Sequence, residues 1–449
     1  MIARDECLKW MGAALASGTL VLSMPAFGQS ASDAVDSLNG SATVFGGVTH
    51  TRVDTATGRD SNTRPSAGVS GAIGGSMSSG ANSLALRYGG TLETQRRLPT
   101  GDQTDSSSVT GAARYQYYNP GGRLDFNLGH SVQSVRNDTG FVLNSGDYDT
   151  RNTLTAGTGL MFYPGAVTSL RLSAQAGQSY GGGDLNDNES WTAASELTRR
   201  LTERSVGTLN VRRSWSETRG IDTTIDNAEL GYERQLETGS FSLAAGGSWS
   251  ETEFPGQSVT NESEAATGHV ARTWVTPDSS TAIRYNRRLS DSATDLSLNL
   301  PQELAFLPDT VQLRDLVVSD ALLVSHTTSR LCQICQVSVL AEAAMLESKL
   351  SDLKTHEYRA SMSLDLDLTR VHQLLVTYSW QGDAGEDSGD VLEQTHRLDI
   401  AVTRRLAEDT HMGVELNQAW VRNKELNRDQ EQYGLRVFLT RDFSLLARR

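Results

Sequence analysis

Residues Tyr358 to Thr369 read YRASMSLDLDLT, and their side chains alternate between two chemical characters. The even positions carry Tyr358, Ala360, Met362, Leu364, Leu366 and Leu368, and the odd positions carry Arg359, Ser361, Ser363, Asp365, Asp367 and Thr369. Successive side chains of a β-strand point to opposite faces, so the segment predicts a strand with one apolar and one charged face.

The same alternation recurs along the chain. Leu124, Phe126 and Leu128 oppose Arg123, Asp125 and Asn127, and Leu398, Ile400 and Val402 oppose Arg397, Asp399 and Thr403. These runs are about twice the usual ~5–6 residues of a strand in a globular sandwich. An amphipathic sheet of a soluble sandwich or solenoid is the alternative. The run length favours strands that cross a membrane at a tilt, with apolar residues toward lipid and polar residues toward a lumen.

Composition points to the same fold class. Mean hydropathy is −0.38, and only 37% of the residues are hydrophobic. Beyond the N-terminus, no segment approaches the roughly 18 apolar residues of a membrane helix. A bilayer protein without spanning helices must close its sheet to satisfy every backbone polar group. We therefore predict an all-β fold, a transmembrane antiparallel up-and-down β-barrel.

A hairpin unit supports a strand count. A strand, a tight polar turn and a second strand ending in Trp recur at Glu196–Trp215, Leu230–Trp249, Leu364–Trp380 and Asp399–Trp420. Longer connections rich in Gly, Asp, Asn and Ser separate the units. Short turns that alternate with longer loops are typical of outer-membrane barrels, whose short turns are periplasmic. We count about 20 strands, within a range of about 18–22, with both termini in the periplasm. The segment Val337–Leu350 alternates weakly, and its run AEAAMLE also suits a helix.

The first residues have the pattern of a targeting signal. Arg4 and Lys9 form a basic start, Trp10–Met24 is mostly apolar or small, and Ala26-Phe27-Gly28 suits a signal peptidase. We expect residues 1–28 to be a signal peptide and residues 29–449 to be the barrel, located in the cell outer membrane.

Four tryptophans predict an aromatic girdle. Trp215, Trp249, Trp380 and Trp420 each follow a tight turn by a similar distance and share the apolar phase of their strands. A barrel's apolar band is about 25 Å tall and bordered by aromatic rings. We place these four in the ring at the outer side of the membrane.

The opposite phase predicts the lumen wall. It carries charges of both signs, so strong charge selectivity is not expected. The lumen charges are Arg87, Arg123, Arg171, Arg200, Arg284, Arg288, Arg359, Asp365, Asp367, Arg397, Asp399, Glu415 and Arg436.

Motifs for chemistry are sparse. Cys332 and Cys335, in a predicted periplasmic turn, are the mature chain's only cysteines, and an oxidising compartment favours a disulfide between them. The histidines are scattered, and neither G-x-S-x-G nor a phosphate-binding loop is present. We therefore predict no enzyme activity, no cofactor and no metal. A net charge of −14 argues against nucleic acid as a partner.

The C-terminal segment carries a resemblance. Tyr433, Leu435, Val437, Leu439 and Phe443 share one phase, and Ser444–Arg449 follow. Tyr433 to Phe443 resembles the closing strand that the barrel-assembly machinery recognises, although that strand ordinarily ends at its aromatic residue. In pattern and length, the chain is similar to outer-membrane barrels associated with exopolysaccharide and PEP-CTERM sorting loci. The resemblance implies a role in envelope or polysaccharide secretion, with polysaccharide export components as partners beside outer-membrane lipid and lipopolysaccharide.

Two function classes remain open, a transport or secretion channel and a non-conducting scaffold or receptor barrel. A barrel of about 20 strands is too wide for its own wall side chains to fill. Ala293–Thr310, the longest connection, contains Leu298, Leu300, Leu304, Phe306 and Leu307 as well as Pro301 and Pro308. We predict that it folds inward and narrows the channel; the alternative is that it packs on the outer rim or contacts a partner.

Overall fold

The computed structural model describes residues 35–56, 58–98, 100–136, 148–181, 188–218, 220–254, 260–291, 316–331, 334–349, 354–385, 391–424 and 427–445. These residues form twenty strands in one sheet, and none of them forms a helix long and apolar enough to cross a membrane. The strands are β1 Val35–Thr55, β2 Gly58–Ser79, β3 Asn82–Arg96, β4 Gln103–Tyr118, β5 Leu124–Arg136, β6 Tyr148–Gly165, β7 Thr168–Tyr180, β8 Asn188–Thr202, β9 Ser205–Thr218, β10 Ile221–Leu236, β11 Gly239–Glu253, β12 Thr260–Thr276, β13 Ser279–Asp291, β14 Leu316–Thr328, β15 Cys335–Ser348, β16 Lys354–Thr369, β17 His372–Gly385, β18 Val391–Ala407, β19 Thr410–Asn423 and β20 Arg428–Ser444.

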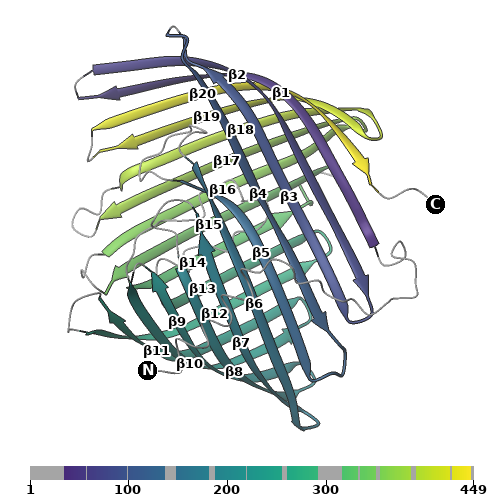
Figure 1. The fold of residues 1–449 in the computed structure, drawn as a ribbon, viewed down its shortest axis with the longest axis vertical. Helices are drawn as coiled ribbons and strands as arrows, with labels where there is room; N and C mark the ends of the chain where they lie inside the picture. The colour runs from purple at the N-terminus through teal and green to yellow at the C-terminus, as the bar shows by residue number, and fades with distance from the viewer. Residues whose placement is uncertain are drawn as a thin grey trace.

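The sheet closes on itself. Each strand pairs antiparallel with the next one along the chain, and β20 pairs with β1 from Asn39↔Ser444 to Asp54↔Asp429. In Figure 1, β1 and β20 accordingly lie side by side. The predicted up-and-down barrel is confirmed, and its twenty strands agree with the expected count.

The helical alternative for Val337–Leu350 is wrong. Residues Cys335–Ser348 form β15, which pairs with β14 and β16 along its length. The AEAAMLE run has helix propensity, but as a strand its backbone groups pair with both neighbours, which a closed sheet requires. Tertiary pairing overrides the local preference here.

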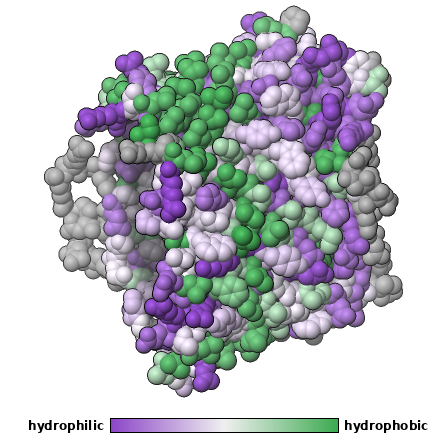
Figure 2. Space-filling model, turned by 180° about the vertical axis from the view of Figure 1, so that it is seen from behind, coloured by the Kyte–Doolittle hydropathy of each residue, from purple (hydrophilic) through white to green (hydrophobic). Residues whose placement is uncertain are grey.

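The outer face of the barrel is apolar. Leu435, Val437 and Leu439 of β20 share one phase, and each is more than 40% exposed. In Figure 2, exposed apolar side chains gather in a broad area of the outer surface. A soluble monomer rarely exposes so much contiguous apolar surface, whereas lipid covers it in a bilayer. The apolar phase therefore faces outward, and the polar phase faces the lumen.

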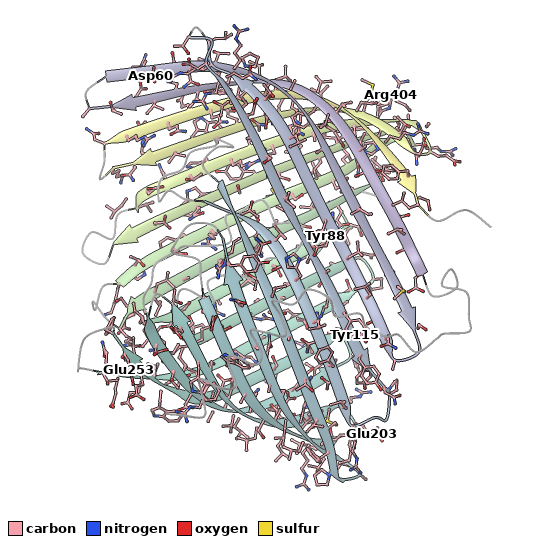
Figure 3. The ribbon with its side chains drawn as sticks, viewed as in Figure 1. Asp60, Tyr88, Tyr115, Glu203, Glu253 and Arg404 are labelled. Carbon is pink, nitrogen blue, oxygen red and sulfur yellow. The ribbon has the colours of Figure 1, made fainter. Side chains whose placement is uncertain are left out.

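Outward aromatic side chains satisfy their polar ends within the sheet. The hydroxyl of Tyr88 lies 2.7 Å from Nδ1 of His130, and the hydroxyl of Tyr115 donates to Asn82 Oδ1 at 2.6 Å. Figure 3 shows these two tyrosines on the neighbouring strands β3 and β4. Hydroxyls paired in this way can face the membrane without an unsatisfied donor.

The two ends of the barrel differ. At the end where β1 begins and β20 ends, two-residue turns such as Gly80–Ala81, Glu203–Arg204 and Glu237–Thr238 join successive strands. The longest connection, residues 292–315 between β13 and β14, lies at the opposite end. Short turns mark the periplasmic side of an outer-membrane barrel, so β1 begins and β20 ends on the periplasmic side, and the opposite ends of the strands are extracellular.

Two ladders of the closed sheet stop before their strands end. The β4–β5 ladder stops at Gly111↔Val132, and the β12–β13 ladder stops at Gly268↔Arg287. Both glycines have positive φ angles, 155° and 157°. A Cβ would collide with the carbonyl oxygen of Arg87 at Gly111 and with that of Ala244 at Gly268. Only glycine fits this kinked backbone without strain, and a glycine therefore marks each point where the wall splits.

Candidate functional site: the lumen and an inward-folded hairpin

Above the split at Gly268, β13 separates from β12, while β14 stays paired with β13 on one side and with β15 on the other, as far as Val317↔Ser348. The β13–β14 ladder continues to Asp291↔Leu316, although β12 no longer accompanies β13. We call Arg288–Asp291 of β13 and Leu316–Ser319 of β14 the tongue.

The contacts of the tongue place it inside the barrel. Leu289, Leu316 and Val318 form a buried cluster that packs against Ile225 of β10 and Ala265 of β12. Ile225 pairs with Ser214 of β9, so it lies in the phase opposite to that of Trp215. Ala265 pairs with Ser248 of β11, opposite to the phase of Trp249. Both partners therefore face the lumen.

A hydrogen bond supports the same placement. The Ser216 hydroxyl of β9 donates to Asp291 Oδ2 of β13 at 2.7 Å. Ser216 follows Trp215, so its side chain points to the lumen side. The bond passes over β10, β11 and β12, which separate β9 from β13 in the sheet. The tip of the tongue thus reaches across the inner face of three strands.

The wall beneath the tongue is buried and its polar groups are paired. Ser248 of β11, in the inward phase, is 1% exposed. Asn227 donates from Nδ2 to Ser248 Oγ at 2.8 Å and to Thr267 Oγ1 at 3.3 Å. These bonds offset the cost of removing amide and hydroxyl groups from water.

Packing energy favours the inward position. The exposed fractions of Leu289, Leu316 and Val318 are 7%, 4% and 0%. Burial of each such side chain contributes about 1.5–3 kcal/mol relative to leaving it in water. Exposure to an aqueous lumen would lose that contribution, so the tongue stays against the wall.

A charged cluster holds the base of the tongue. Arg287 and Asp320 are register partners, and Arg287 Nη1 lies 2.8 Å from Asp320 Oδ2. The Tyr285 hydroxyl donates to Asp320 Oδ1 at 2.6 Å. Arg287 Nε also donates to the Ala266 carbonyl oxygen of β12 at 3.1 Å. Arg287 therefore bridges the split, because it bonds β14 through Asp320 and the free edge of β12 through Ala266.

Most of the predicted lumen charges lie on strands. Arg123 precedes β5, beside the periplasmic turn, and Arg288 belongs to the tongue. The others share the inward phase of their strands, namely Arg87 of β3, Arg171 of β7, Arg200 of β8, Arg284 of β13, Arg359, Asp365 and Asp367 of β16, Arg397 and Asp399 of β18, Glu415 of β19 and Arg436 of β20.

Several lumen charges form ion pairs along the wall. Arg171 Nη2 lies 2.8 Å from Asp125 Oδ1, and Arg397 Nε lies 2.7 Å from Asp399 Oδ2. Arg359, only 6% exposed, approaches Glu357 at 3.1 Å and Glu342 at 4.0 Å. The sequence analysis did not single out Glu342 or Glu357, although both share the inward phase of their strands. Paired charges of both signs give the wall little net field.

Arg436 has a different environment. Its guanidinium carbon lies 3.8 Å from the ring centroid of Phe45, a lumen-side aromatic on β1 that the sequence analysis did not identify. Phe45 fits there because Gly68 of β2 leaves room, since a Cβ at Gly68 would collide with the ring. A cavity of about 190 Å³ lies beside this pair, lined also by Glu93 and Gln432. The cation–π contact fixes the orientation of the arginine in the lumen wall.

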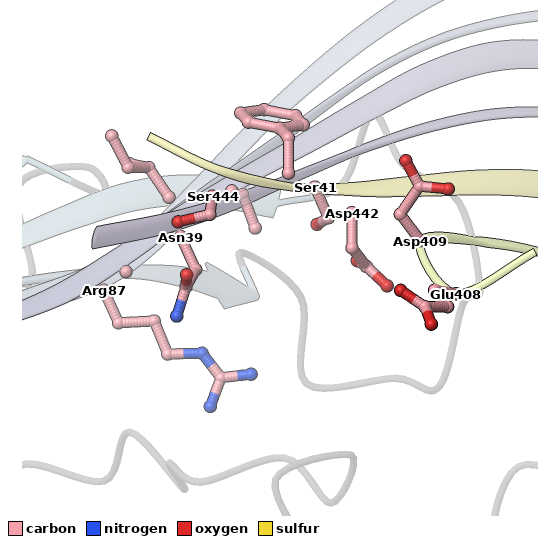
Figure 4. Close-up of a pocket in the computed structure, with 12 residues that line it drawn as sticks. Asn39, Ser41, Arg87, Glu408, Asp409, Asp442 and Ser444 are labelled. Carbon is pink, nitrogen blue, oxygen red and sulfur yellow. The ribbon is translucent and has the colours of Figure 1, made fainter. Parts of the chain in front are cut away.

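A second cavity lies at the periplasmic mouth, where β1 meets β20. Figure 4 shows Arg87 on one side and Asp442, Asp409 and Glu408 on the other. Its volume is about 490 Å³. The Thr410 hydroxyl donates to Asp409 Oδ1 at 3.0 Å and lowers the pKa of this turn carboxyl. Among the described residues, no group of His, Cys, Asp and Glu side chains could hold a metal ion.

The four predicted girdle tryptophans all lie in the outward phase, near the extracellular ends of β9, β11, β17 and β19. Trp380 and Trp420 both pair with His396 of β18. Trp215 pairs with Trp191 of β8, which the sequence analysis did not identify. The alternation of Trp191 with Ala193, Ser195 and Leu197 is the signal that could have found it.

Trp274 occupies the other border. It lies near the periplasmic end of β12, and Arg272 lies over its ring at 4.9 Å from the centroid. Arg213 stacks on Trp215 at 5.5 Å in the same manner and approaches Asp226 at 3.4 Å. Outward arginines beside interfacial tryptophans can extend their charged heads to the headgroups.

The remaining predicted residues lie near the periplasmic end or at the closure of the barrel. Cys335 begins β15 and is disulfide-bonded, and its predicted partner Cys332 lies outside the described residues. Tyr433 and Phe443 lie on β20 in the outward phase, and Phe443 pairs with Gly40 of β1. Residues 1–28 and Ala293–Thr310, assigned from the sequence to a signal peptide and a constriction, also lie outside the described residues.

The closed sheet, the apolar exterior and the aromatic borders define an outer-membrane β-barrel, the architecture of envelope channels and receptors. No protein-family model and no curated sequence matches the chain. Its fold is similar to the siderophore receptor PirA from Pseudomonas aeruginosa, with 10% identity, a TM-score of 0.48, and coverage of 91% of this chain and 81% of that one. OccAB1 from Acinetobacter baumannii is also 10% identical, with a TM-score of 0.36 and coverage of 92% and 99%. The ferric-catecholate import receptor Fiu from E. coli is 11% identical, with a TM-score of 0.44 and coverage of 88% of this chain and 81% of that one.

Proposed function

We propose that this protein is an aqueous channel of the outer membrane that carries polar solutes across the envelope. The observation that carries the proposal is the closed ring of twenty strands with a polar, ion-paired inner face. A circular ring of this many strands, tilted near 40°, is roughly 40 Å across. Barrels of 16–18 strands already leave an aqueous channel.

The wall chemistry supports polar solutes of mixed character over one class of ion. Arg171 and Arg397 are each neutralised by a neighbouring carboxylate, so the wall offers hydrogen-bonding groups without a dominant charge. The resemblance to barrels of exopolysaccharide loci extends the proposal to secretion of a polysaccharide. The activity that we expect of the chain is transport, without a catalytic step.

A planar bilayer tests the proposal directly. Purified mature protein, shown to be folded by heat-modifiable gel migration, should insert and produce discrete conductance steps in potassium chloride. Because the wall charges are paired, the conductance for potassium and for chloride should be nearly equal. Folded protein that inserts without any conductance would contradict the channel. A gene deletion that leaves secreted polysaccharide unchanged would contradict the secretion role alone.

A non-conducting receptor or scaffold barrel is the second candidate. Its supporting observation is the burial of inward-facing wall residues Leu340, Ser361 and Ser379, each at most 6% exposed. Inward-facing wall residues are also buried in a barrel whose lumen is filled, as in a non-conducting barrel. Silent insertion in the bilayer assay would favour this candidate.

A further inference from the structure

We propose that the tongue is a fixed constriction of the lumen, latched to the inner wall by Asp291 and parted from β12 at Gly268. The inference rests on the proposed channel function, because a constriction matters only where solute passes. The position of the tongue is a separate claim, however, and can be tested without any conductance.

The backbone at the split fixes the place where β12 and β13 separate. β12 continues to Thr260 beyond its last pair with β13, so β12 and β13 diverge at Gly268↔Arg287. Gly268 adopts a positive φ, and the backbone of Ala244 leaves no room for a side chain there. Arg287 closes the base of the split by bonding Asp320 and the carbonyl oxygen of Ala266. β12 and β13 therefore part at a defined pair of residues, Gly268 and Arg287.

The latch follows from both faces of the tongue. On the wall side, Leu289 and Val318 pack on Ile225 and Ala265, and Asp291 accepts the Ser216 bond. On the other face, Ser290 is 1% exposed. The tongue is buried on both faces, and β14 stays paired with β15 as far as Val317↔Ser348, which makes the tongue a fixed element rather than a moving gate.

The narrowing follows from sheet geometry. Two packed sheet layers lie about 10 Å apart, so the tongue forms a second layer about 10 Å inside β10–β12, in a barrel whose full ring of twenty strands is roughly 40 Å across. The tongue covers β10–β12, which lie across the ring from the closure of β1 and β20. The tongue therefore narrows one side of the lumen, and solute is displaced toward the opposite wall, which carries Phe45 and Arg436.

Cysteine cross-linking tests the position. In a background with Cys332→Ser and Cys335→Ser, the pair Ser216→Cys and Asp291→Cys should form a disulfide in the purified, oxidised protein. The matched control is Glu217→Cys with Asp291→Cys, because Glu217 is the next residue on β9 and points outward. Cross-linking of the control pair but not the Ser216 pair would overturn the inward position, whatever the conductance.

A shortened hairpin tests the narrowing. Arg288 and Ser319 are register partners, so an Asn-Gly turn can join them in place of residues 289–318. Conductance of this variant should rise about twofold, since one layer of the lumen is removed. The matched control replaces only residues 294–313 with a Gly-Ser linker and retains both halves of the tongue. An equal rise in the control, or no rise in the folded shortened variant, would overturn the constriction by the tongue.

The two proposals fail differently. If the wild-type protein inserts without conducting, the channel proposal fails, while the cross-linking result still reports where the tongue lies. If the wild type conducts and the shortened variant conducts equally, the channel remains and the constriction is wrong. Should the shortened variant not fold, the cross-linked Ser216 and Asp291 pair supplies the second readout, because a fixed constriction keeps the same conductance before and after reduction.

Discussion

Ser216 and Asp291 lie in strands separated by three others, yet the Ser216 hydroxyl donates to Asp291 Oδ2 at 2.7 Å. Neighbouring strands of a sheet lie about 4.8 Å apart, so two residues four strands apart cannot meet within the plane of the wall. The contact requires β13 to leave that plane toward the lumen. This single bond therefore distinguishes a simple cylinder from a barrel with a hairpin folded inside it.

The apolar contacts of the tongue should contribute measurably to stability. Leu316→Ala removes a side chain that is 4% exposed and leaves a cavity against the wall. We expect the free energy of unfolding in lipid vesicles, from urea titration of Trp fluorescence, to fall by about 2–4 kcal/mol. Leu331→Ala is the matched control, because Leu331 lies in a turn and is 72% exposed. Equal effects at the two positions would contradict the packing of the tongue.

The glycine at the split should resist substitution. Gly268→Ala places a methyl group against the Ala244 carbonyl oxygen, at a φ angle of 157°. We expect a loss of more than about 1 kcal/mol in stability and slower folding into detergent micelles. Gly46→Ala is the control, since the nearest atom to its Cβ position is the Ser66 carbonyl oxygen at 3.8 Å. A Gly268→Ala variant as stable as the control would argue against a backbone at the split that only glycine can adopt.

The base of the tongue should depend on Asp320. Its side chain is 12% exposed and accepts from both Arg287 and Tyr285. Asp320→Asn removes a charge-assisted bond, and we expect a cost of about 1–3 kcal/mol by the same vesicle titration. In the control Asp226→Asn, the lost partner is Arg213 at 3.4 Å, with side chains about half exposed. That exposed pair should contribute less than about 1 kcal/mol. The opposite ranking would refute the role of Asp320.

The thiols of the periplasmic turn should be oxidised. Cys335 is disulfide-bonded in the structure, and we predict Cys332 as its partner in the mature protein. Thiol titration of denatured, unreduced protein should find no free thiol, and two per chain would refute the pairing. The double replacement by Ser should change stability little, because so short a loop removes little unfolded-state entropy.

The sequence by itself determined the fold class. The alternation from Tyr358 to Thr369 assigns one face of a strand to an apolar environment and the other to a polar one, without reference to any distant residue. The outward phase of Trp215, Trp249, Trp380 and Trp420 follows from the same rule. Period-two patterns depend only on the local backbone, and so they can be recognised along the chain.

Only the tertiary structure decided where the barrel departs from a cylinder. Leu289, Leu316 and Val318 continue the outward phase of their strands, so alternation alone places them toward lipid. In the folded barrel they pack on Ile225 and Ala265 inside the lumen, because β13 separates from β12 at Gly268. The identity of the surface that buries an apolar side chain depends on strands far away in the sequence. No local pattern records that choice, and the position of the tongue therefore emerges only when the sheet has closed.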